Sequence, residues 1–250
     1  MIYVTAYRPS EMWPKGLPRL AGKYLTKILV QADVFRDDIR SMGYSGPVVV
    51  LPLIPPEPAT TAGPTSRSKR VIKIGFVGRL VAQKNVDYLL AIANELKAAP
   101  LEFHIFGGGE DEDALRSKAA ATSVNINFHG EIERHSVLDA IDSCDAIAVT
   151  SISEGQCLVA LEALSRGKPL LATPVGALPE ILCSGRFGVE LPLNNEKYAA
   201  EKTWKLAEEI FRGEWSRNKI ISEYSVAFSR DQILHDYRKH LQWSMDSSQQ

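Results

Sequence analysis

The feature that constrains the fold most is a regular alternation of two apolar patterns between residues 71 and 191. Short continuous apolar runs, typical of buried strands, lie at 71–78, 101–107, 125–130, 145–151, 169–174 and 187–191. Segments with apolar residues at helical spacing lie between them, at 85–99, 110–121, 135–144, 155–167 and 177–182. This alternation predicts an α/β fold, a Rossmann-like parallel sheet with helices on both faces. Such sheets bind ligands beyond the carboxyl ends of their strands.

The flanking segments divide the chain into four parts. A strand, a helix and a second strand are predicted over 26–52, and the Pro-, Thr- and Ser-rich stretch that follows predicts a linker. Residues 194–242 are predicted to be helical throughout, with a frayed tail after them. We therefore expect a front unit at 1–55, a linker at 56–70, the main domain at 71–225, and a final helix and tail at 226–250.

Composition excludes several classes of function. The net charge is −1, so the basic excess of a nucleic-acid-binding protein is absent. Three scattered cysteines provide neither a disulfide framework nor metal-ligand spacing. The start of the chain lacks the apolar core of a signal peptide, and no run reaches the roughly 18 apolar residues that span a bilayer. We expect a cytoplasmic protein, with peripheral contact at the inner membrane face left open.

The sequence FGGGEDED, residues 106–113, resembles two cofactor motifs. A dinucleotide fingerprint that starts at Gly107 would need a glycine at the position of Glu112, so a NAD site is disfavoured. Asp111 and Asp113 have the Asp-x-Asp spacing of a metal site. Acidic residues are also favoured in the first turn of a helix, where they meet the positive end of its dipole. We prefer that second interpretation and expect no metal cofactor.

Arg79 and Lys84 follow Gly78 in the loop after the first strand of the main domain. This loop lies at the carboxyl edge of the predicted sheet, where ligands bind. A guanidinium fork and an ammonium five residues apart can clamp a diphosphate. A solvated basic loop explains the same residues equally well, so both interpretations stay open.

Glu154 and Glu162 are two carboxylates in an otherwise apolar stretch. Glu154 is predicted in the loop after the fourth strand, and Glu162 about two turns along a helix that begins near Gln156. Within one regular helix, eight residues span roughly 12 Å, close to the distance from a ribose to a sugar across two phosphates. The alternative is that Glu154 caps the helix and Glu162 faces solvent. The same loop holds Cys157, which we interpret as a small residue that lets the backbone approach a ligand.

Several segments strongly resemble the C-terminal, donor-binding domain of the family 4 (group 1) glycosyltransferases. They are GFVGRLVAQKNVDYLL, FHIFGGGEDEDALR and the region from NINFHG to ALPEIL, in the same order as in the family. The resemblance is dense from residue 71 to about 190. It implies the GT-B architecture, in which two Rossmann-like domains face a cleft, and residues 1–55 would be a remnant of the N-terminal, acceptor-side domain.

The resemblance also implies roles for individual residues. Arg79 and Lys84 would hold the diphosphate, Glu154 would lie near the donor sugar, and Glu162 would bind the ribose hydroxyls. The residues implied to surround the donor are Gly78, Glu131, Ile132, Gly155, Gln156, Cys157 and Leu158. A nucleotide-diphosphate sugar would be the donor substrate, and the family needs no metal for catalysis.

The chain departs from the family pattern in two ways. Gln156 and Cys157 stand where the family usually has an aromatic and a small residue, and most of an N-terminal domain has no counterpart in residues 1–60. The implied function is a retaining transfer of a hexosyl unit to a glycan or lipid-linked acceptor, with a second polypeptide as a candidate source of the N-terminal domain. A non-catalytic nucleotide-sugar-binding or scaffolding module is the main alternative, and a nucleotide-sugar epimerase is a further one.

Overall fold

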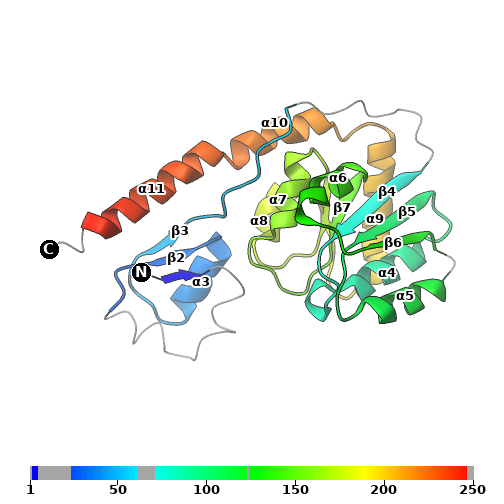
Figure 1. Ribbon diagram of the computed structural model, residues 1–250, viewed down its shortest axis with the longest axis horizontal. Coiled ribbons are helices and arrows are strands. Elements are labelled where there is room, and N and C mark those ends of the chain that lie inside the picture. Colours follow the sequence, from blue (N-terminus) through cyan, green and yellow to red (C-terminus); the bar gives the residue numbers. More distant parts are fainter. Residues whose placement is uncertain (1, 5–23, 61–70, 123, 247–250) are drawn as a thin grey trace.

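The computed structural model of the chain describes residues 2–4, 24–60, 71–122 and 124–246. Figure 1 shows a large unit built on one sheet, a smaller unit built on a second sheet, and C-terminal helices that run alongside both. Residues 61–70 of the expected linker and residues 247–250 of the expected tail lie outside the described residues.

The large unit contains a six-stranded sheet in which every pair of neighbouring strands is parallel. Its strands are β4 (Ile72–Val77), β5 (Leu101–Phe106), β6 (Ile126–Gly130), β7 (Ala146–Val149), β8 (Leu170–Ala172) and β9 (Gly188–Glu190). Each strand lies within an apolar run that predicts it, and four of the six are fewer than six residues long. The predicted α/β fold with a parallel sheet is confirmed.

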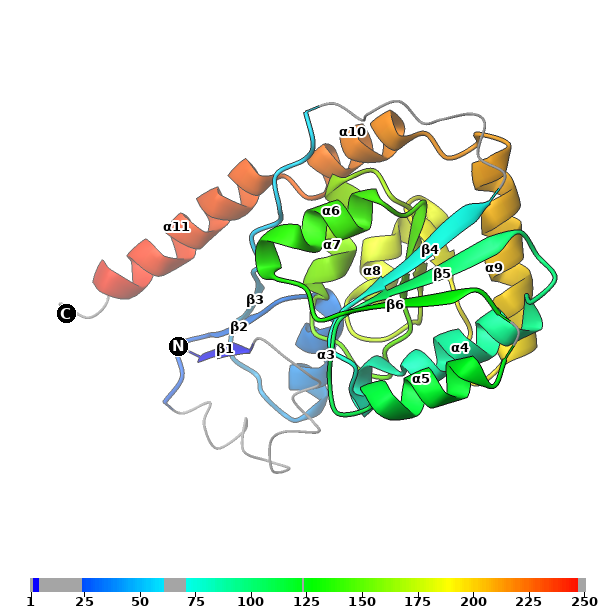
Figure 2. The same ribbon diagram turned by 45° about the vertical axis from the view of Figure 1, so that its right-hand side comes forward.

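Helices cover both faces of this sheet (Figure 2). The helices packed on one face are α4 (Val86–Glu95), α5 (Glu112–Ala120) and α9 (Glu196–Phe211). Those on the other face are α6 (Val137–Asp142), α7 (Leu158–Ser165), α8 (Leu178–Leu182) and α10 (Arg217–Ala227). The side chains of β4 alternate between the two faces of the sheet. Ile72, Ile74 and Phe76 pack with α4, α5 and α9, and Val77 packs with the helices on the other face. Burial on both faces explains why β7 and β8 are apolar throughout, whereas the edge strand β6 is only partly buried and carries Asn127 and His129.

The strand order β6-β5-β4-β7-β8-β9 reverses direction once. From β4 the chain adds β5 and then β6 on one side, and it returns to place β7 on the other side of β4. The connections that leave β4 and β7 therefore run in opposite directions from the boundary between these two strands. In an open parallel sheet, this divergence leaves a crevice at the carboxyl ends of the two strands.

The smaller unit is a three-stranded parallel sheet of β1 (Ile2–Val4), β2 (Ile28–Val30) and β3 (Val48–Val50), with helix α3 (Asp33–Ser41) packed against it. The sequence predicts β2, α3 and β3, whereas the three-residue strand β1 was not predicted. Ile28, Phe35 and Ile39 are buried in the same cluster as Leu178 and Ile181 of α8. One hydrophobic core thus extends from the small sheet into the large unit.

The prediction that residues 194–242 are helical throughout is wrong, because non-helical residues separate the helices at 212–216 and 228–229. The segment forms α9, α10 and α11 (Arg230–Asp246) with breaks between them. Gly213, with φ of 75°, lies just past the end of α9, and the Ser216 side chain accepts a hydrogen bond from the Lys219 N–H to cap α10. Within the described ranges, no helix is long and apolar enough to cross a membrane.

The segment between β3 and residue 60 is fastened to the C-terminal helices. The Tyr224 hydroxyl donates to the Pro56 carbonyl at 2.8 Å, and the Arg230 guanidinium donates to the Pro55 carbonyl at 3.0 Å. The Ala59 N–H donates to the Ser165 carbonyl at the end of α7, at 2.9 Å. These bonds hold residues 55–59 against α7, α10 and α11.

Candidate functional site

A cleft of about 400 Å³ lies at the point where the strand order reverses. Its walls come from the loops that follow β4 and β7, the start of α7, and the turn at Arg134 that precedes α6. Gln31 and Leu53 of the smaller unit complete it. The cleft therefore combines the carboxyl edge of the large sheet with residues that follow β2 and β3.

Glu154 and Lys84 form an ion pair in this cleft. The Glu154 side chain is 7% exposed, and its Oε1 lies 2.6 Å from Lys84 Nζ. The same oxygen accepts a hydrogen bond from the Ser151 hydroxyl at 2.6 Å. Lys84 ends a short 3₁₀ turn, Ala82–Lys84, and its side chain is 25% exposed. One unit of each charge is thus placed side by side in a poorly solvated position, and an anionic ligand can approach the exposed side of the ammonium.

Helix α7 begins at Leu158, two residues later than the predicted start near Gln156. Cys157 has φ of 55° and ψ of 82°, a left-handed conformation that cannot belong to a right-handed helix. Residues 154–157 are therefore not helical, and the regular-helix distance between Glu154 and Glu162 does not apply. The N-cap position is Cys157 and has no side-chain cap, while the Glu154 carboxylate binds Lys84 and Ser151. The alternative in which Glu154 caps the helix is wrong.

The loop that carries Glu154 rests on Gly176. The Ala177 N–H donates to the Gly155 carbonyl at 3.0 Å. Gly176 has φ of 55°, and a Cβ added there would lie 2.1 Å from the Glu154 carbonyl oxygen. Glycine is required here for both its backbone conformation and its missing side chain. The backbone of Glu154 therefore packs directly against Gly176 in the loop after β8, and this contact fixes its position.

Glu162 is half-buried on α7 and lines the cleft. Burial raises the pKa of the Glu162 carboxyl above its ordinary value, while the Arg134 guanidinium lowers that pKa. Arg134 lines the same cleft. The interpretation in which Glu162 simply faces solvent does not fit this position.

The structure brings most of the residues singled out in the sequence to the cleft. Those that line it are Gly78, Lys84, Glu154, Gly155, Gln156, Cys157, Leu158 and Glu162. Arg79, Glu131 and Ile132 do not. Arg79 is exposed, and of the two cations in the loop after β4 Lys84 alone lines the cleft. Glu131 is exposed beside Gly108, and Ile132 packs against the core.

Besides the apolar residues Val77, Val137 and Val159, four residues that line the cleft were not predicted from the sequence. They are Gln31, Leu53, Gln83 and Arg134. Gln31 follows a predicted strand directly, so the rule that ligands bind at carboxyl ends of strands would have indicated it. Leu53 had no such signal. It reaches the cleft because its N–H donates to the Gln156 side-chain oxygen, a contact between residues 103 positions apart.

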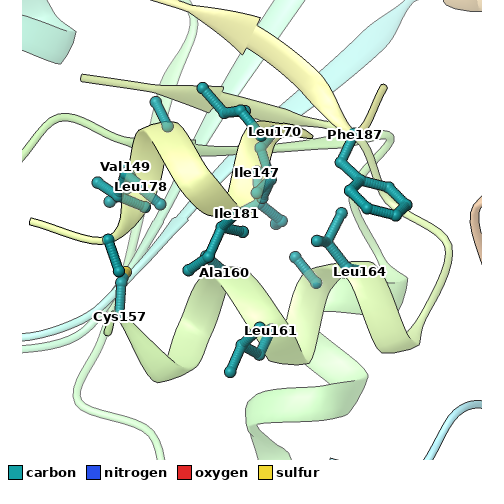
Figure 3. Close-up of a cluster of buried hydrophobic side chains, with 14 of the residues drawn as sticks. Ile147, Val149, Cys157, Ala160, Leu161, Leu164, Leu170, Leu178, Ile181 and Phe187 are labelled. Atoms are coloured by element: carbon teal, nitrogen blue, oxygen red, sulfur yellow. The ribbon is translucent and has the colours of Figure 1, made fainter. Parts of the chain in front are cut away.

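The Cys157 thiol points away from solvent, toward Val149 and Leu178 (Figure 3). Burial raises its pKa to about 12. We expect the native protein to leave Cys157 unmodified by iodoacetamide at about pH 8, because the thiolate is the reactive form. Peptide mass spectrometry checks this, with urea-unfolded protein as the control in which all three cysteines are labelled. Fast labelling of Cys157 in the folded chain would contradict the packing described.

Comparison with known proteins adds a family to this geometry. The family described as glycosyl transferases group 1 matches residues 63–221, well over half of the chain. The chain belongs to this family. An uncharacterised glycosyltransferase of Methanocaldococcus jannaschii is 30% identical over 167 residues, which cover 66% of this chain and 46% of that protein. The alpha-maltose-1-phosphate synthase of Mycolicibacterium smegmatis is 27% identical and is covered to 47%. The chain thus spans about half the length of these curated relatives.

Solved structures share the fold. Anabaena HepE in complex with UDP superimposes with a TM-score of 0.80 at 16% identity, over 96% of this chain and 71% of that one. The pneumococcal O-GlcNAc transferase GtfA, in complex with UDP and GlcNAc, gives a TM-score of 0.77 at 20% identity, over 97% of this chain and 52% of GtfA. The fold of this group 1 chain, small unit included, therefore matches a large part of both proteins.

Proposed function

We propose that this chain forms the donor side of a retaining glycosyltransferase that moves a hexosyl unit from a nucleotide-diphosphate sugar to a glycan or lipid-linked acceptor. The observation that carries the proposal is the Lys84–Glu154 pair in a cleft at the reversal of strand order, with Glu162 on the same wall. Family membership and the UDP complexes of HepE and GtfA support it.

Lys84 is the residue assigned to the diphosphate. Its ammonium has three donors, so it can bind a phosphate oxygen while it keeps its bond to Glu154. Arg134 is a second cation on the cleft wall, and the first N–H groups of α7 add partial positive charge at its start. As the bond from the anomeric carbon to the diphosphate oxygen breaks, negative charge grows on the leaving group, and these groups stabilise it. No metal ion is needed for that role. Arg79 would join it only by a change in side-chain position.

The two glutamates are assigned to the two ends of the donor. Glu162 lies on the helix, where its carboxylate can accept hydrogen bonds from ribose hydroxyls. Glu154 is deeper and held by two partners, as suits a group that must stay in place beside the transferred sugar. The backbone at Gln156, Cys157 and Leu158 borders the space between them. The remainder of the acceptor side, in the same or a second polypeptide, is the partner this proposal requires.

Titration of the purified chain with UDP-, GDP- and ADP-glucose by calorimetry tests the donor site, followed by an assay of donor hydrolysis. We expect binding of at least one nucleotide sugar. Absence of binding by all three would remove the donor-site proposal. Binding without hydrolysis or transfer would favour a non-catalytic nucleotide-sugar-binding module.

Lys84→Ala and Asp111→Ala form a matched pair for this titration. Removing the ammonium deletes a charge-assisted hydrogen bond, so we expect Lys84→Ala to weaken binding of the nucleotide diphosphate by roughly tenfold or more. Asp111 immediately precedes α5 and does not line the cleft, so Asp111→Ala should leave the affinity unchanged. A larger loss in Asp111→Ala, or a requirement for Mg²⁺, would instead support the Asp-x-Asp metal interpretation.

A further inference from the structure

The 3₁₀ turn Ala82–Lys84 supports the loop after β7 at the point where β4 and β7 stop pairing. The last paired residues of these two strands are Gly75 and Ile147. Beyond them the loop after β7 is bonded to the turn, because the Ile152 N–H donates to the Gln83 carbonyl at 2.9 Å. The turn therefore bridges the two sides of the crevice in which the cleft lies.

The Gln83 side chain adds a second bond to the same loop. Gln83 is half-buried, and its Nε2 donates to the Ser153 carbonyl at 2.8 Å. That carbonyl belongs to the planar peptide unit that joins Ser153 to Glu154, so the bond fixes the orientation of this unit. Gln83 thus holds the chain immediately before Glu154 with its amide and one residue earlier with its backbone.

Glu154 is consequently held from both sides. The peptide before it is bonded to the Gln83 amide, and the carbonyl of Gly155 after it accepts from the Ala177 N–H at 3.0 Å. Its carboxylate binds the ammonium of Lys84, the residue that follows Gln83 in the chain. Two consecutive residues of one short turn therefore hold the backbone and the side chain of the Glu154 loop.

A neutral amide suits this position better than a charged side chain. The Ser153 carbonyl needs a donor, and an ionised carboxylate has none. A lysine or arginine could donate, but it would bring a second cation to the single carboxylate that Lys84 already binds. Glutamine satisfies the carbonyl and leaves the charges of the ion pair balanced.

We propose that Gln83 is a positioning residue of the donor site, whose amide holds Glu154 in place beside the transferred sugar. This inference rests on the proposed function, which assigns Glu154 to the sugar and Lys84 to the diphosphate. Loss of the amide acts on the two assignments unequally. The Lys84 backbone stays fastened, because the Thr150 hydroxyl donates to the Lys84 carbonyl at 3.1 Å. The peptide before Glu154 loses the Gln83 side-chain bond.

Gln83→Met tests this difference, since methionine keeps the length of the side chain and removes the amide. The ligands are the tightest binder among UDP-, GDP- and ADP-glucose and its free nucleoside diphosphate, titrated by calorimetry. We expect the affinity for the nucleotide sugar to fall by roughly fivefold or more, because a displaced group costs binding and orientation of the sugar. The affinity for the free diphosphate should change by less than about twofold. Equal losses for both ligands, or no loss, overturn the proposal.

Gln83→Glu provides a rescue that depends on pH. Its carboxyl group would face the Ser153 carbonyl and lie near the Glu154 carboxylate, whose charge Lys84 partly offsets, so we expect its pKa to be raised. The protonated form can donate to the carbonyl as the amide does. Relative to the wild type at the same pH, affinity for the nucleotide sugar should therefore rise in Gln83→Glu from about pH 8 to about pH 5 and stay constant in Gln83→Met. Flat profiles in both variants would mean that Gln83 only fills space.

Gln232→Met is the matched control. Gln232 is exposed on α11, its amide donates to Asp236 at 3.0 Å, and it does not line the cleft. The substitution removes a hydrogen bond of the same kind, so both affinities should stay at the wild-type values. A selective loss of nucleotide-sugar affinity in Gln232→Met as large as that in Gln83→Met would contradict a role specific to Gln83.

Urea unfolding separates this inference from the proposed function, because it needs no ligand. If Gln83 holds Glu154, the shifts in urea midpoint of Gln83→Met and Glu154→Gln should be less than additive in the double variant. If all three nucleotide sugars fail to bind, the proposed function fails, and coupled midpoints leave Gln83 as a support of the ion pair alone. If a nucleotide sugar binds but the midpoints add and both ligands are weakened alike, the donor site stands and the positioning role of Gln83 is overturned.

Discussion

Gly176→Ala should lower the free energy of unfolding by about 3 kcal/mol and weaken nucleotide binding at least tenfold. A left-handed conformation costs an L-residue roughly 1–2 kcal/mol, and overpacking adds about 1–3 kcal/mol. The added Cβ would lie 2.1 Å from the Glu154 carbonyl oxygen and 2.7 Å from the Gly155 carbonyl oxygen, and both atoms are backbone. The loop must move, and it carries the carboxylate that faces the cleft. Urea unfolding and calorimetric titration measure the two effects.

Gly213→Ala is the matched control for this substitution. Gly213 has φ of 75°, so it shares the left-handed backbone, but a Cβ added there meets nothing within 4 Å. We expect it to lower the free energy of unfolding by about 1 kcal/mol, the conformational part alone, and to leave nucleotide binding unchanged. Equal effects of the two substitutions would show that contact with the Glu154 loop is unimportant.

Lys84→Met and Glu154→Gln should each lower the free energy of unfolding by about 2 kcal/mol, and the double variant should lose less than the sum. Removal of one partner of a buried ion pair leaves the other charge without compensation and costs about 3–5 kcal/mol. We reduce that value because the Lys84 side chain is 25% exposed, whereas Glu154 is 7% exposed. Residues in direct contact are coupled by about 0.5–3 kcal/mol, so part of the stability returns when both charges are absent.

Binding distinguishes structural from functional roles of the same pair. In the double variant, stability recovers in part, but the ammonium assigned to the diphosphate is still missing. We therefore expect the double variant to bind UDP as weakly as Lys84→Met does. Urea unfolding of the four proteins gives the coupling, and titration gives the affinities. Strict additivity in stability would mean that the ion pair contributes nothing, and recovery of UDP binding in the double variant would remove Lys84 from the phosphate site.

The alternation of apolar runs with helical segments in the sequence was sufficient to predict the large sheet. Six apolar runs separated by helical segments leave a parallel sheet as the main way to bury both strand faces, and the structure contains those strands. The residues of the cleft that lie in the loops after strands, such as Gly78 and Glu154, could be predicted on the same basis. Their burial and pairing could not, because the ion pair joins loops 70 residues apart.

The wrong predictions have physical causes that the spacing of apolar residues does not reveal. Helix α7 begins late because Cys157 is left-handed, a state for which the sequence has no glycine to serve as a signal. The segment predicted to be helical over 194–242 is interrupted at 212–216 and at 228–229, and the first interruption contains Gly213 and Ser216, two residue types that are typical of helix ends. Arg79 was paired with Lys84 by proximity in sequence, yet only Lys84 lines the cleft, at the end of its 3₁₀ turn.

The core that passes from the small sheet into the large unit has a thermodynamic consequence. Phe35 and Ile39 of α3 are buried in one cluster with Ile181 of α8. The segment between β3 and residue 60 forms hydrogen bonds with α7, α10 and α11. Side chains that bury one another lose their stability together. Two sheets that are separate in their hydrogen bonding therefore share one buried core, and loosening α3 would expose part of the core that also supports the wall holding Glu154.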